Sequence, residues 1–305
     1  MRVLLQFPEG LKQHALRYAK ELEDRGNDVV ISASPAYGAC DLAIDEARKI
    51  GADKLVHFGH NEFLHAPPDF PVEYVPYEMT AELSILSECL KELEGYRRIG
   101  LVTTVQHMHQ LDEVRAFYER NGKDVRIGRP YGFAKRSGQI LGCDVGSASS
   151  IDKDVECFVY FGGGLFHPLG AVYGTTKPFL SIDPFIGRWL WLDDYRKKKE
   201  RMTRAKITRG IVARSFGILV STKIGQYNMN LAQILKSTLE KNGKTAAILV
   251  SNTFDFESLE NMREFDAFVN TACPRIGSDD VDRLSKPLLS ANELIEVIGI
   301  IKAGL

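Results

Sequence analysis

Short apolar runs alternate with amphipathic stretches along the whole chain. The run Arg2–Phe7 is typical of a buried strand, and Ala15, Leu16, Ala19 and Leu22 then recur at helical spacing. Similar apolar runs, bounded by Gly, Pro and polar turns, predict the other strands. The predicted strands are 2–7, 28–32, 54–58, 73–76, 98–104, 125–127, 157–161, 179–182, 216–221, 245–250 and 267–271. The predicted helices are 11–25, one from 41 onward, 81–93, 108–121, 186–206, 228–242 and 291–303.

The order of these elements predicts the fold class. Strands that alternate with helices favour α/β units whose parallel sheets are covered by helices on both faces. The 305 residues are enough for two or three such domains. We therefore predict three similar parallel-sheet α/β domains in a pseudo-threefold arrangement, covering 1–95, 96–206 and 207–305. Ligands of such sheets bind beyond the C-terminal ends of the strands.

An internal repeat supports this division. A displacement of 103 residues places Cys40-Asp41 on Cys143-Asp144, and Val56-His57-Phe58-Gly59 on Val159-Tyr160-Phe161-Gly162. A weaker copy of the second segment, Val269-Asn270-Thr271-Ala272, follows after a further 110 residues. A cysteine and a strand end that recur at one displacement indicate a duplicated α/β unit.

The five cysteines fall into two groups. They form no CxxC pair, so neither a disulfide framework nor a local zinc knuckle is expected. Cys89 and Cys157 lie in an apolar helix and strand, where free cysteine packs as a small hydrophobe. Cys40, Cys143 and Cys273 lie in loops after strands, although Cys273 follows a later strand than the other two. Three thiolates at one sheet edge would hold a metal cluster around a central site and leave one metal position open.

A glycine-rich loop is a second candidate site. Gly162, Gly163 and Gly164 follow a strand, and glycine lets the backbone approach a ligand closely. The pattern is not GxGxxG, so it is not a dinucleotide fingerprint. His167 in this loop and Asp183 at the end of the next strand are candidate contacts to a ligand. A plain turn remains the alternative.

The first strand of each predicted domain also ends in a polar loop. These loops contain Gln106, His107, Lys223 and Gln226. If each loop opens a helix, its free N–H groups can bind an anion, and the four side chains are candidate cofactor ligands. Ordinary turns and helix caps would explain the same residues.

Composition narrows the class of protein. The net charge of −1 gives no general attraction to nucleic acid or membranes. No apolar run reaches the roughly 18–20 residues of a membrane span, and the N-terminus does not look like a signal peptide. We therefore expect a cytoplasmic protein with reduced thiols and no direct nucleic-acid binding. The basic stretch 195–214 is a solvated helix face or a docking surface for an acidic or RNA-bound partner protein.

Several separated motifs together resemble one known family. The archaeal 2-(3-amino-3-carboxypropyl)histidine synthases of diphthamide biosynthesis are similar to this chain over nearly its whole length. The motifs that carry the resemblance are Tyr37-Gly38-Ala39-Cys40-Asp41, Thr103-Thr104-Val105-Gln106-His107, Gly138-Gln139-Ile140-Leu141-Gly142-Cys143, Ser221-Thr222-Lys223 with Gly225-Gln226, and Ala272-Cys273-Pro274-Arg275.

The resemblance implies a reaction and its cofactors. Cys40, Cys143 and Cys273 would bind a 4Fe-4S cluster, and S-adenosylmethionine would be the co-substrate. The 3-amino-3-carboxypropyl group would pass to a histidine of translation elongation factor 2 by radical chemistry, with release of methylthioadenosine. The family further implies a homodimer and an electron donor. Arg275 is a candidate partner for the methionine carboxylate, because guanidinium pairs with carboxylate in a bidentate manner.

Four alternatives remain open from the sequence. Quinolinate synthase also combines three α/β domains with one cluster cysteine from each. A non-enzymatic iron–sulfur scaffold or electron carrier would need no substrate pocket. Zinc with the three cysteines and His60, His65 or His167 would replace the cluster, and a cluster-free binding protein would use the cysteines only for packing.

Overall fold

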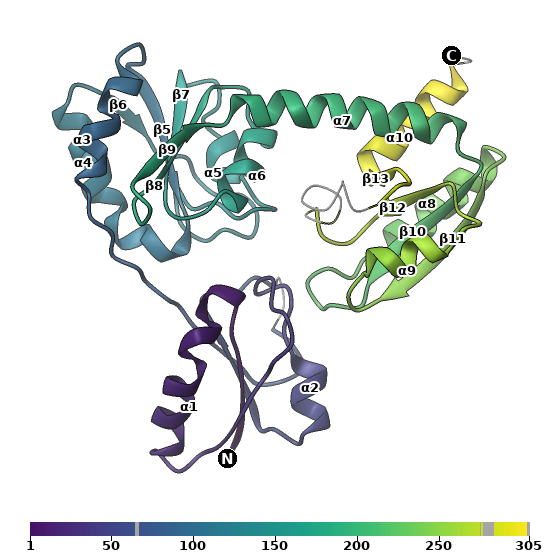
Figure 1. Cartoon of the computed structure of the whole chain (residues 1–305), viewed down its shortest axis with the longest axis horizontal. Coiled ribbons are helices and arrows are strands. Elements are labelled where there is room, and N and C mark those ends of the chain that lie inside the picture. The colour runs from purple at the N-terminus through teal and green to yellow at the C-terminus, as the bar shows by residue number, and fades with distance from the viewer. Residues whose placement is uncertain (65–66, 275, 277–283, 304–305) are drawn as a thin grey trace. The chain divides into compact units, whose positions relative to one another are not determined.

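The computed structural model describes residues 1–64, 67–274, 276 and 284–303 (Figure 1). The chain divides into two compact units, Met1–Arg196 and Lys197–Leu305. The first unit contains two β-sheets and the second contains one. No helix in the described part of the chain has the length and apolarity needed to cross a bilayer.

The three sheets share one order of their first four strands, and the second sheet adds a fifth strand. Their orders are β2-β1-β3-β4, β6-β5-β7-β8-β9 and β11-β10-β12-β13, and every pair is parallel except β8 with β9. The prediction of an α/β protein with three parallel sheets is therefore confirmed. The strands are β1 (Arg2–Gln6), β2 (Asp28–Ile31), β3 (Lys54–Phe58), β4 (Val72–Val75), β5 (Arg98–Thr103), β6 (Asp124–Arg126), β7 (Cys157–Phe161), β8 (Phe179–Asp183), β9 (Arg188–Trp191), β10 (Ser215–Ser221), β11 (Thr245–Ser251), β12 (Ala267–Asn270) and β13 (Leu288–Ser290).

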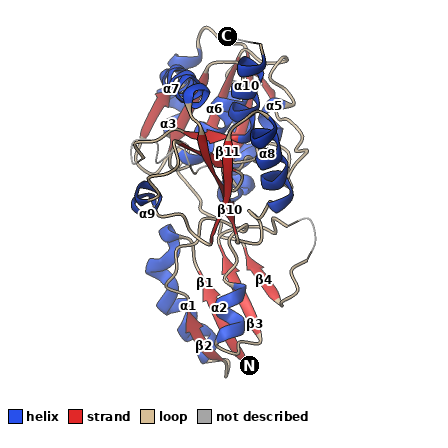
Figure 2. Cartoon of the chain, turned by 90° about the vertical axis from the view of Figure 1, so that its right-hand side faces the viewer, coloured by secondary structure: helices blue, strands red, loops and turns tan. Residues whose placement is uncertain are grey.

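Helices cover both faces of the first sheet (Figure 2). Alternate residues of a strand point to opposite faces. Val3 therefore packs against Ala19 of one helix, while Leu4 packs against Ala47 of another. The helical segments are η1 (Glu9–His14), α1 (Ala15–Glu23) and α2 (Ile44–Lys49). This arrangement leaves the carboxyl ends of the strands uncovered for the loops that follow them.

The second sheet is covered in the same way. Leu101 packs with α3 and α4 on one face, and Val102 packs with α5 and α6 on the other. The predicted helix 81–93 is in fact α3 followed by η2, and it packs on the second sheet. Cys89 and Cys157 are buried in this core, as expected for packing residues. The helical segments are α3 (Ile85–Cys89), η2 (Leu90–Leu93), η3 (Val105–Gln110), α4 (Leu111–Arg120), α5 (Gly146–Ser149) and α6 (Phe166–Gly174).

The prediction of a helix from Ile186 is wrong at its start. The structure has the antiparallel strand β9 there, and α7 (Asp193–Val212) begins after it. Trp189 and Trp191 pack against the core while Leu190 between them is exposed, which is the period of a strand. The two acidic residues that open α7 suit the positive end of a helix dipole.

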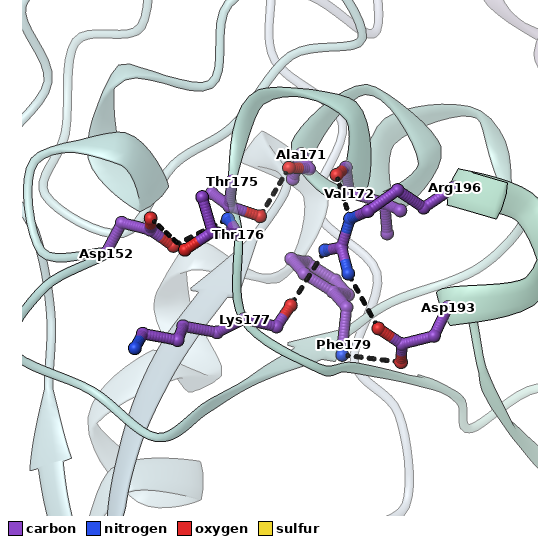
Figure 3. A network of polar contacts seen from close by, with 9 residues as sticks. All are labelled: Asp152, Ala171, Val172, Thr175, Thr176, Lys177, Phe179, Asp193 and Arg196. Atoms are coloured by element: carbon purple, nitrogen blue, oxygen red, sulfur yellow. Dashed lines mark hydrogen bonds and ion pairs between the residues drawn. The ribbon is translucent and has the colours of Figure 1, made fainter. Parts of the chain in front are cut away.

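The first turn of α7 is held to the second sheet by Arg196 (Figure 3). Its guanidinium donates to the carbonyls of Val172 (3.1 Å) and Lys177 (2.7 Å) and pairs with Asp193 (2.7 Å). The Asp193 carboxylate also accepts from the backbone N–H of Phe179, at 3.3 Å. One side chain thus ties α7 to α6 and to the segment that follows α6.

The third sheet forms the core of the second unit. Ile218 packs with α7, α8 and α10 on one face, and Leu219 packs with α9 on the other. The C-terminal helix starts at a capping box, in which Ser290 and Glu293 each bond the other's backbone N–H. Its remaining helices are α8 (Met229–Lys241), α9 (Phe256–Asn261) and α10 (Ala291–Lys302).

Candidate functional site

The loop that carries Cys40 is held by the last side chain of β1. The Gln6 amide nitrogen donates to the Asp41 carbonyl at 2.6 Å, and its oxygen accepts from the Ala43 N–H at 3.2 Å. The Asp41 carboxylate turns back to accept from the Tyr37 N–H at 3.3 Å. The backbone on both sides of Cys40 is therefore fixed by buried polar groups at the edge of the first sheet.

The Cys143 loop is held by an aspartate and by close packing. Asp144 accepts from the backbone N–H groups of Ala134 (2.8 Å) and Gly146 (2.9 Å). A Cβ on Gly142 would lie 2.0 Å from Cζ of Phe166 in α6. Only glycine fits at this point of contact, so the Cys143 backbone lies directly on α6. The repeated Cys-Asp pair thus has a structural role: the aspartate fixes the turn that presents the cysteine.

The Cys273 loop is held by the last residue of β12. The Asn270 amide nitrogen donates to the carbonyls of Cys273 (2.7 Å) and Ile276 (2.9 Å). Its oxygen accepts from the Ala272 N–H at 2.9 Å. The buried carboxamide therefore satisfies three backbone groups of the loop, in the way that Gln6 satisfies two in the Cys40 loop.

The five thiols differ in exposure. Cys143 is exposed, and Cys40 and Cys273 are half-buried. Burial raises the pKa of Cys89 to about 11 and that of Cys157 to about 12, so both stay protonated and inert. Among the residues that the structure describes, no group of three or more His, Cys, Asp or Glu side chains forms a metal site. Ligation by Cys40, Cys143 and Cys273 therefore stays a prediction.

The glycine-rich loop after β7 is shaped by its glycines and by Asp183. Gly162 (φ 154°) and Gly164 (φ 72°) have backbone angles that other residues rarely adopt, and a Cβ on Gly162 would lie 2.7 Å from Oη of Tyr160. The Asp183 carboxylate accepts from the N–H groups of Gly164 (2.9 Å) and Phe185 (3.0 Å). Each Asp183 oxygen thus holds one backbone N–H group in place. Gly163, between Gly162 and Gly164, is exposed.

Two of the predicted ligand residues lie beside this loop. His107 is buried, with its ring edge against Phe161 and 5.4 Å from the ring of Phe185. Burial lowers its pKa, so the imidazole is neutral. Its Nδ1 has no hydrogen-bond partner among the described residues. His167 lies in the first turn of α6, edge-on to Phe166. The structure therefore brings His107 to the loop that also contains Gly162.

The other predicted ligand residues lie elsewhere. Gln106 donates to the Gly59 carbonyl at 3.1 Å and so connects the first two sheets. Lys223 and Gln226 follow β10 in the second unit, where the Lys223 carbonyl accepts from the Gln226 N–H at 2.9 Å. Arg275 lies outside the described residues, and so does His65 of the zinc alternative.

Sequence reasoning missed the residues that hold the cysteine loops. Gln6 and Asn270 hold the Cys40 and Cys273 loops, and His57 in turn bonds Gln6 at 2.8 Å. The internal repeat could have pointed to this kind of residue, because His57, Tyr160 and Asn270 occupy the same position in its three copies. Each of the three is a buried polar residue at that position. A buried polar group at a strand end requires a partner, which here is a loop beyond the sheet.

Comparison with known proteins places this architecture in one family. The family described as "Putative diphthamide synthesis protein" matches residues 7–303. The 2-(3-amino-3-carboxypropyl)histidine synthase of Pyrococcus horikoshii is 36% identical over 98% of this chain and 86% of its own length. Subunit 1 of the corresponding synthase from Caenorhabditis elegans is 31% identical over 96% of this chain and 74% of its own.

Solved structures agree with these relatives. The crystal structure of Dph2 from Pyrococcus horikoshii with a 4Fe-4S cluster superimposes with a TM-score of 0.88 at 35% identity. The superposition covers 98% of this chain and 86% of that one. A second crystal structure of the same protein gives a TM-score of 0.89 over the same shares. The family match, the sequence relatives and the shared three-sheet fold show that this chain belongs to the diphthamide synthesis family.

Proposed function

We propose that this chain is a 2-(3-amino-3-carboxypropyl)histidine synthase that catalyses the first step of diphthamide biosynthesis. The 3-amino-3-carboxypropyl group of S-adenosylmethionine is joined to an imidazole carbon of a histidine in translation elongation factor 2. A carbon–sulfur bond breaks, methylthioadenosine leaves and the imidazole carbon gives up its proton. The observation that carries the proposal is the match over almost the entire chain to a family whose relatives are this synthase.

Cys40, Cys143 and Cys273 fit the three thiolate ligands of a 4Fe-4S cluster. Each lies in a loop at a strand's carboxyl end, and buried hydrogen bonds or close packing hold its backbone in place. All three are at least partly accessible, whereas Cys89 and Cys157 are buried. When bound, the cluster would supply the electron that cleaves the carbon–sulfur bond and would take it back as the imidazole carbon gives up its proton. Three protein ligands leave one metal position for the co-substrate.

The glycine-rich loop is a fitting site for part of S-adenosylmethionine. Its backbone is held open by Asp183, while the neutral ring of His107 packs beneath Gly162. The role of Asp183 is to keep the Gly164 turn in place, since both of its oxygens bind backbone N–H groups. His107 supports the loop from beneath as a buried, neutral ring and brings no charge to it.

Anaerobic reconstitution tests the proposal. The chain is loaded with iron and sulfide, reduced with dithionite, and mixed with S-adenosylmethionine and elongation factor 2. We expect methylthioadenosine together with a 3-amino-3-carboxypropyl mass increment on one histidine of the factor. A quinolinate synthase or an electron carrier would give neither product, so their absence from a fully loaded sample refutes the proposal.

The cellular setting follows from the same resemblance. The enzyme acts as a homodimer in the cytoplasm and receives electrons from a separate donor. A reducing compartment suits a protein that uses thiolates as ligands. Sedimentation at equilibrium measures the mass of the assembly, and a monomer at micromolar concentration would refute the dimer.

A further inference from the structure

A closed basic loop lies beside Cys143. It covers residues 128–138, between β6 and the segment that carries the cysteine, and a hydrogen bond from the Gly138 N–H to the Gly128 carbonyl joins its ends at 2.9 Å. The loop has three charged residues, which are all exposed cations, namely Arg129, Lys135 and Arg136. No acidic residue occurs between positions 127 and 143, although the whole chain has a net charge of −1. Positive charge is therefore concentrated at this part of the surface.

The charges of the loop are not used within the described part of the chain. None of the ion pairs formed by the described residues includes a cation of this loop. The Asp144 carboxylate, which touches the loop, is buried and accepts from the backbone N–H groups of Ala134 and Gly146. Exposed charges of one sign create a potential that attracts an oppositely charged surface.

Neighbouring residues hold the loop in place. Oε1 of Gln139 accepts from the backbone N–H groups of Lys135 (3.1 Å) and Arg136 (3.2 Å), so the backbone beneath two of the cations is fixed. The ring of Phe133 stacks on Phe63 in the loop after β3, with the ring centroids 4.0 Å apart. A surface that is ordered before it binds loses less conformational entropy on binding.

An exposed aromatic ring of the same loop lies on the turn after Cys143. Tyr131 is 72% exposed, and a Cβ on Gly146 would lie 3.2 Å from its Cδ1. The ring therefore rests on the turn that Asp144 holds. Tyrosine and arginine are enriched in protein interfaces. An exposed tyrosine in a basic loop is thus typical of a surface that binds an acidic protein.

The exposure of Cys143 distinguishes between two kinds of protein partner. Cys143 is exposed, whereas Cys40 and Cys273 are half-buried. In the proposed cluster a cysteine occupies a closed metal position, and the target histidine has to reach the open one. A redox protein has to bring its own centre close to a ligand sulfur, because the electron then passes through the sulfur–iron bond. The surface beside Cys143 therefore suits an electron donor better than it suits elongation factor 2.

We propose that Arg129, Tyr131, Lys135 and Arg136 form the docking surface for an acidic protein that carries a one-electron redox centre. This inference rests on the proposed function, because an electron donor is needed only if a cluster is bound. At this contact one electron leaves the reduced donor and enters the cluster through Cys143, and no covalent bond is made or broken. Encounters of redox proteins bury small areas and depend on complementary charge, which agrees with three cations and one exposed ring.

Binding to the full-length chain, with and without reconstituted iron, tests the surface apart from activity. The probe is oxidised flavodoxin, an acidic one-electron carrier, and calorimetry is done at about 50 mM and about 300 mM salt, since salt screens exposed charges. The test variant combines Lys135→Glu with Arg136→Glu. Its control combines Lys20→Glu with Arg25→Glu, which makes the same change of charge at exposed positions near the C-terminal end of α1.

A second measurement follows electron transfer. The iron-loaded chain is mixed with flavodoxin hydroquinone, and the absorbance of the flavodoxin semiquinone reports the transfer of one electron. Photoreduced deazariboflavin, a small uncharged reductant, bypasses the docking surface. We expect the double variant to bind flavodoxin roughly tenfold or more weakly at low salt and to accept its electron correspondingly more slowly, with the wild-type rate toward deazariboflavin. Tyr131→Ser should weaken binding at both salt concentrations, and the control should match the wild type.

Other outcomes overturn the inference. If the double variant behaves as the control does, or if the wild type shows no salt-dependent binding of flavodoxin, the loop does not receive an acidic donor. If the double variant loses affinity for elongation factor 2 while flavodoxin reduces it at the wild-type rate, the surface belongs to the protein substrate. A wild-type chain that takes up no iron would instead refute the proposed function, and the calorimetry would still report on the loop.

Discussion

Gly142 offers a sharp test of how the Cys143 loop is held. The residue precedes Cys143 and lies against the ring of Phe166 in α6. A Cβ added by Gly142→Ala would lie 2.0, 2.4 and 2.5 Å from Cζ, Cε2 and Cε1 of that ring. The substitution adds a single methyl group, so any effect comes from contact at this point.

The size of the effect follows from these distances. Carbon atoms in contact are about 3.5–4.0 Å apart, so the ring or the backbone must move by more than about 1 Å. Movement of the Gly142 backbone toward α6 is limited, because that backbone already lies close to Gly170. A Cβ on Gly170 would lie 2.5 Å from the Gly142 carbonyl oxygen. Overpacking of this kind costs about 1–3 kcal/mol. We expect the free energy of unfolding to fall by that amount and the Cys143 backbone to be displaced.

Two measurements check this expectation. Urea unfolding followed by tryptophan fluorescence gives the loss of stability, and iron content after anaerobic reconstitution reports the position of Cys143. Gly95→Ala is the matched control, because a Cβ at Gly95 meets nothing within 4 Å. Phe166→Leu in the Gly142→Ala background removes the ring atoms that clash, and should restore part of both losses.

Either of two results would show that Phe166 does not hold the Cys143 loop. Gly142→Ala that matches Gly95→Ala in stability and in iron content would mean that the contact with Phe166 carries no weight. Strict additivity of the Gly142 and Phe166 substitutions would mean that the two residues do not interact. Loss of stability with normal iron content would separate the fold from the site.

Three further predictions follow from the same structure. The pKa of His57 is lowered to about 3 and that of His60 to about 4, against 6.5 for an unfolded chain, so the unfolded state binds more protons below pH 6.5 and stability is lost on acidification. Chemical denaturation at pH 7 and pH 5 should differ by about 2 kcal/mol for each histidine, and an unchanged midpoint would contradict the neutral pair. Because burial raises the pKa of Cys157 to about 12, iodoacetamide should label Cys143 in the native protein and spare Cys157, as mass spectrometry can show; equal labelling would exclude the buried thiol. Replacing Arg196 by Ala removes its bonds to two carbonyls and leaves the Asp193 carboxylate with only the Phe179 N–H, so the free energy of unfolding should fall by about 1–3 kcal/mol. Lys should recover part of this loss, and no change in urea midpoint would show that these bonds contribute nothing.

The fold class was readable from local patterns. Apolar runs such as Cys157–Phe161 and the alternation of strands with helices have physical causes within a few residues of each position. The internal repeat of Cys-Asp pairs was equally visible, and so was the family resemblance. The segment 186–192 was misread as helix, because the two tryptophans become a strand only by pairing with β8 and packing on the core.

The candidate site was only partly readable. Cys40, Cys143 and Cys273 could be proposed from their loops, but nothing local indicates that Gln6 or Asn270 holds two of those loops. Asp183 was proposed as a ligand contact, yet its oxygens accept from the backbone of Gly164 and Phe185. Hydrogen-bond partners far apart along the chain meet only after the sheet has formed.

The sequence by itself determined the α/β units, the candidate cysteines and the family, because periodicity and motif spacing are properties of neighbouring residues. Tertiary structure alone decided which groups satisfy one another. The register of β1 on β3 places Gln6 beside His57, and this single pairing puts a proton on Nδ1 of His57. Burial then removes water as a competing partner, so the proton position on His57 follows from the orientation of one carboxamide.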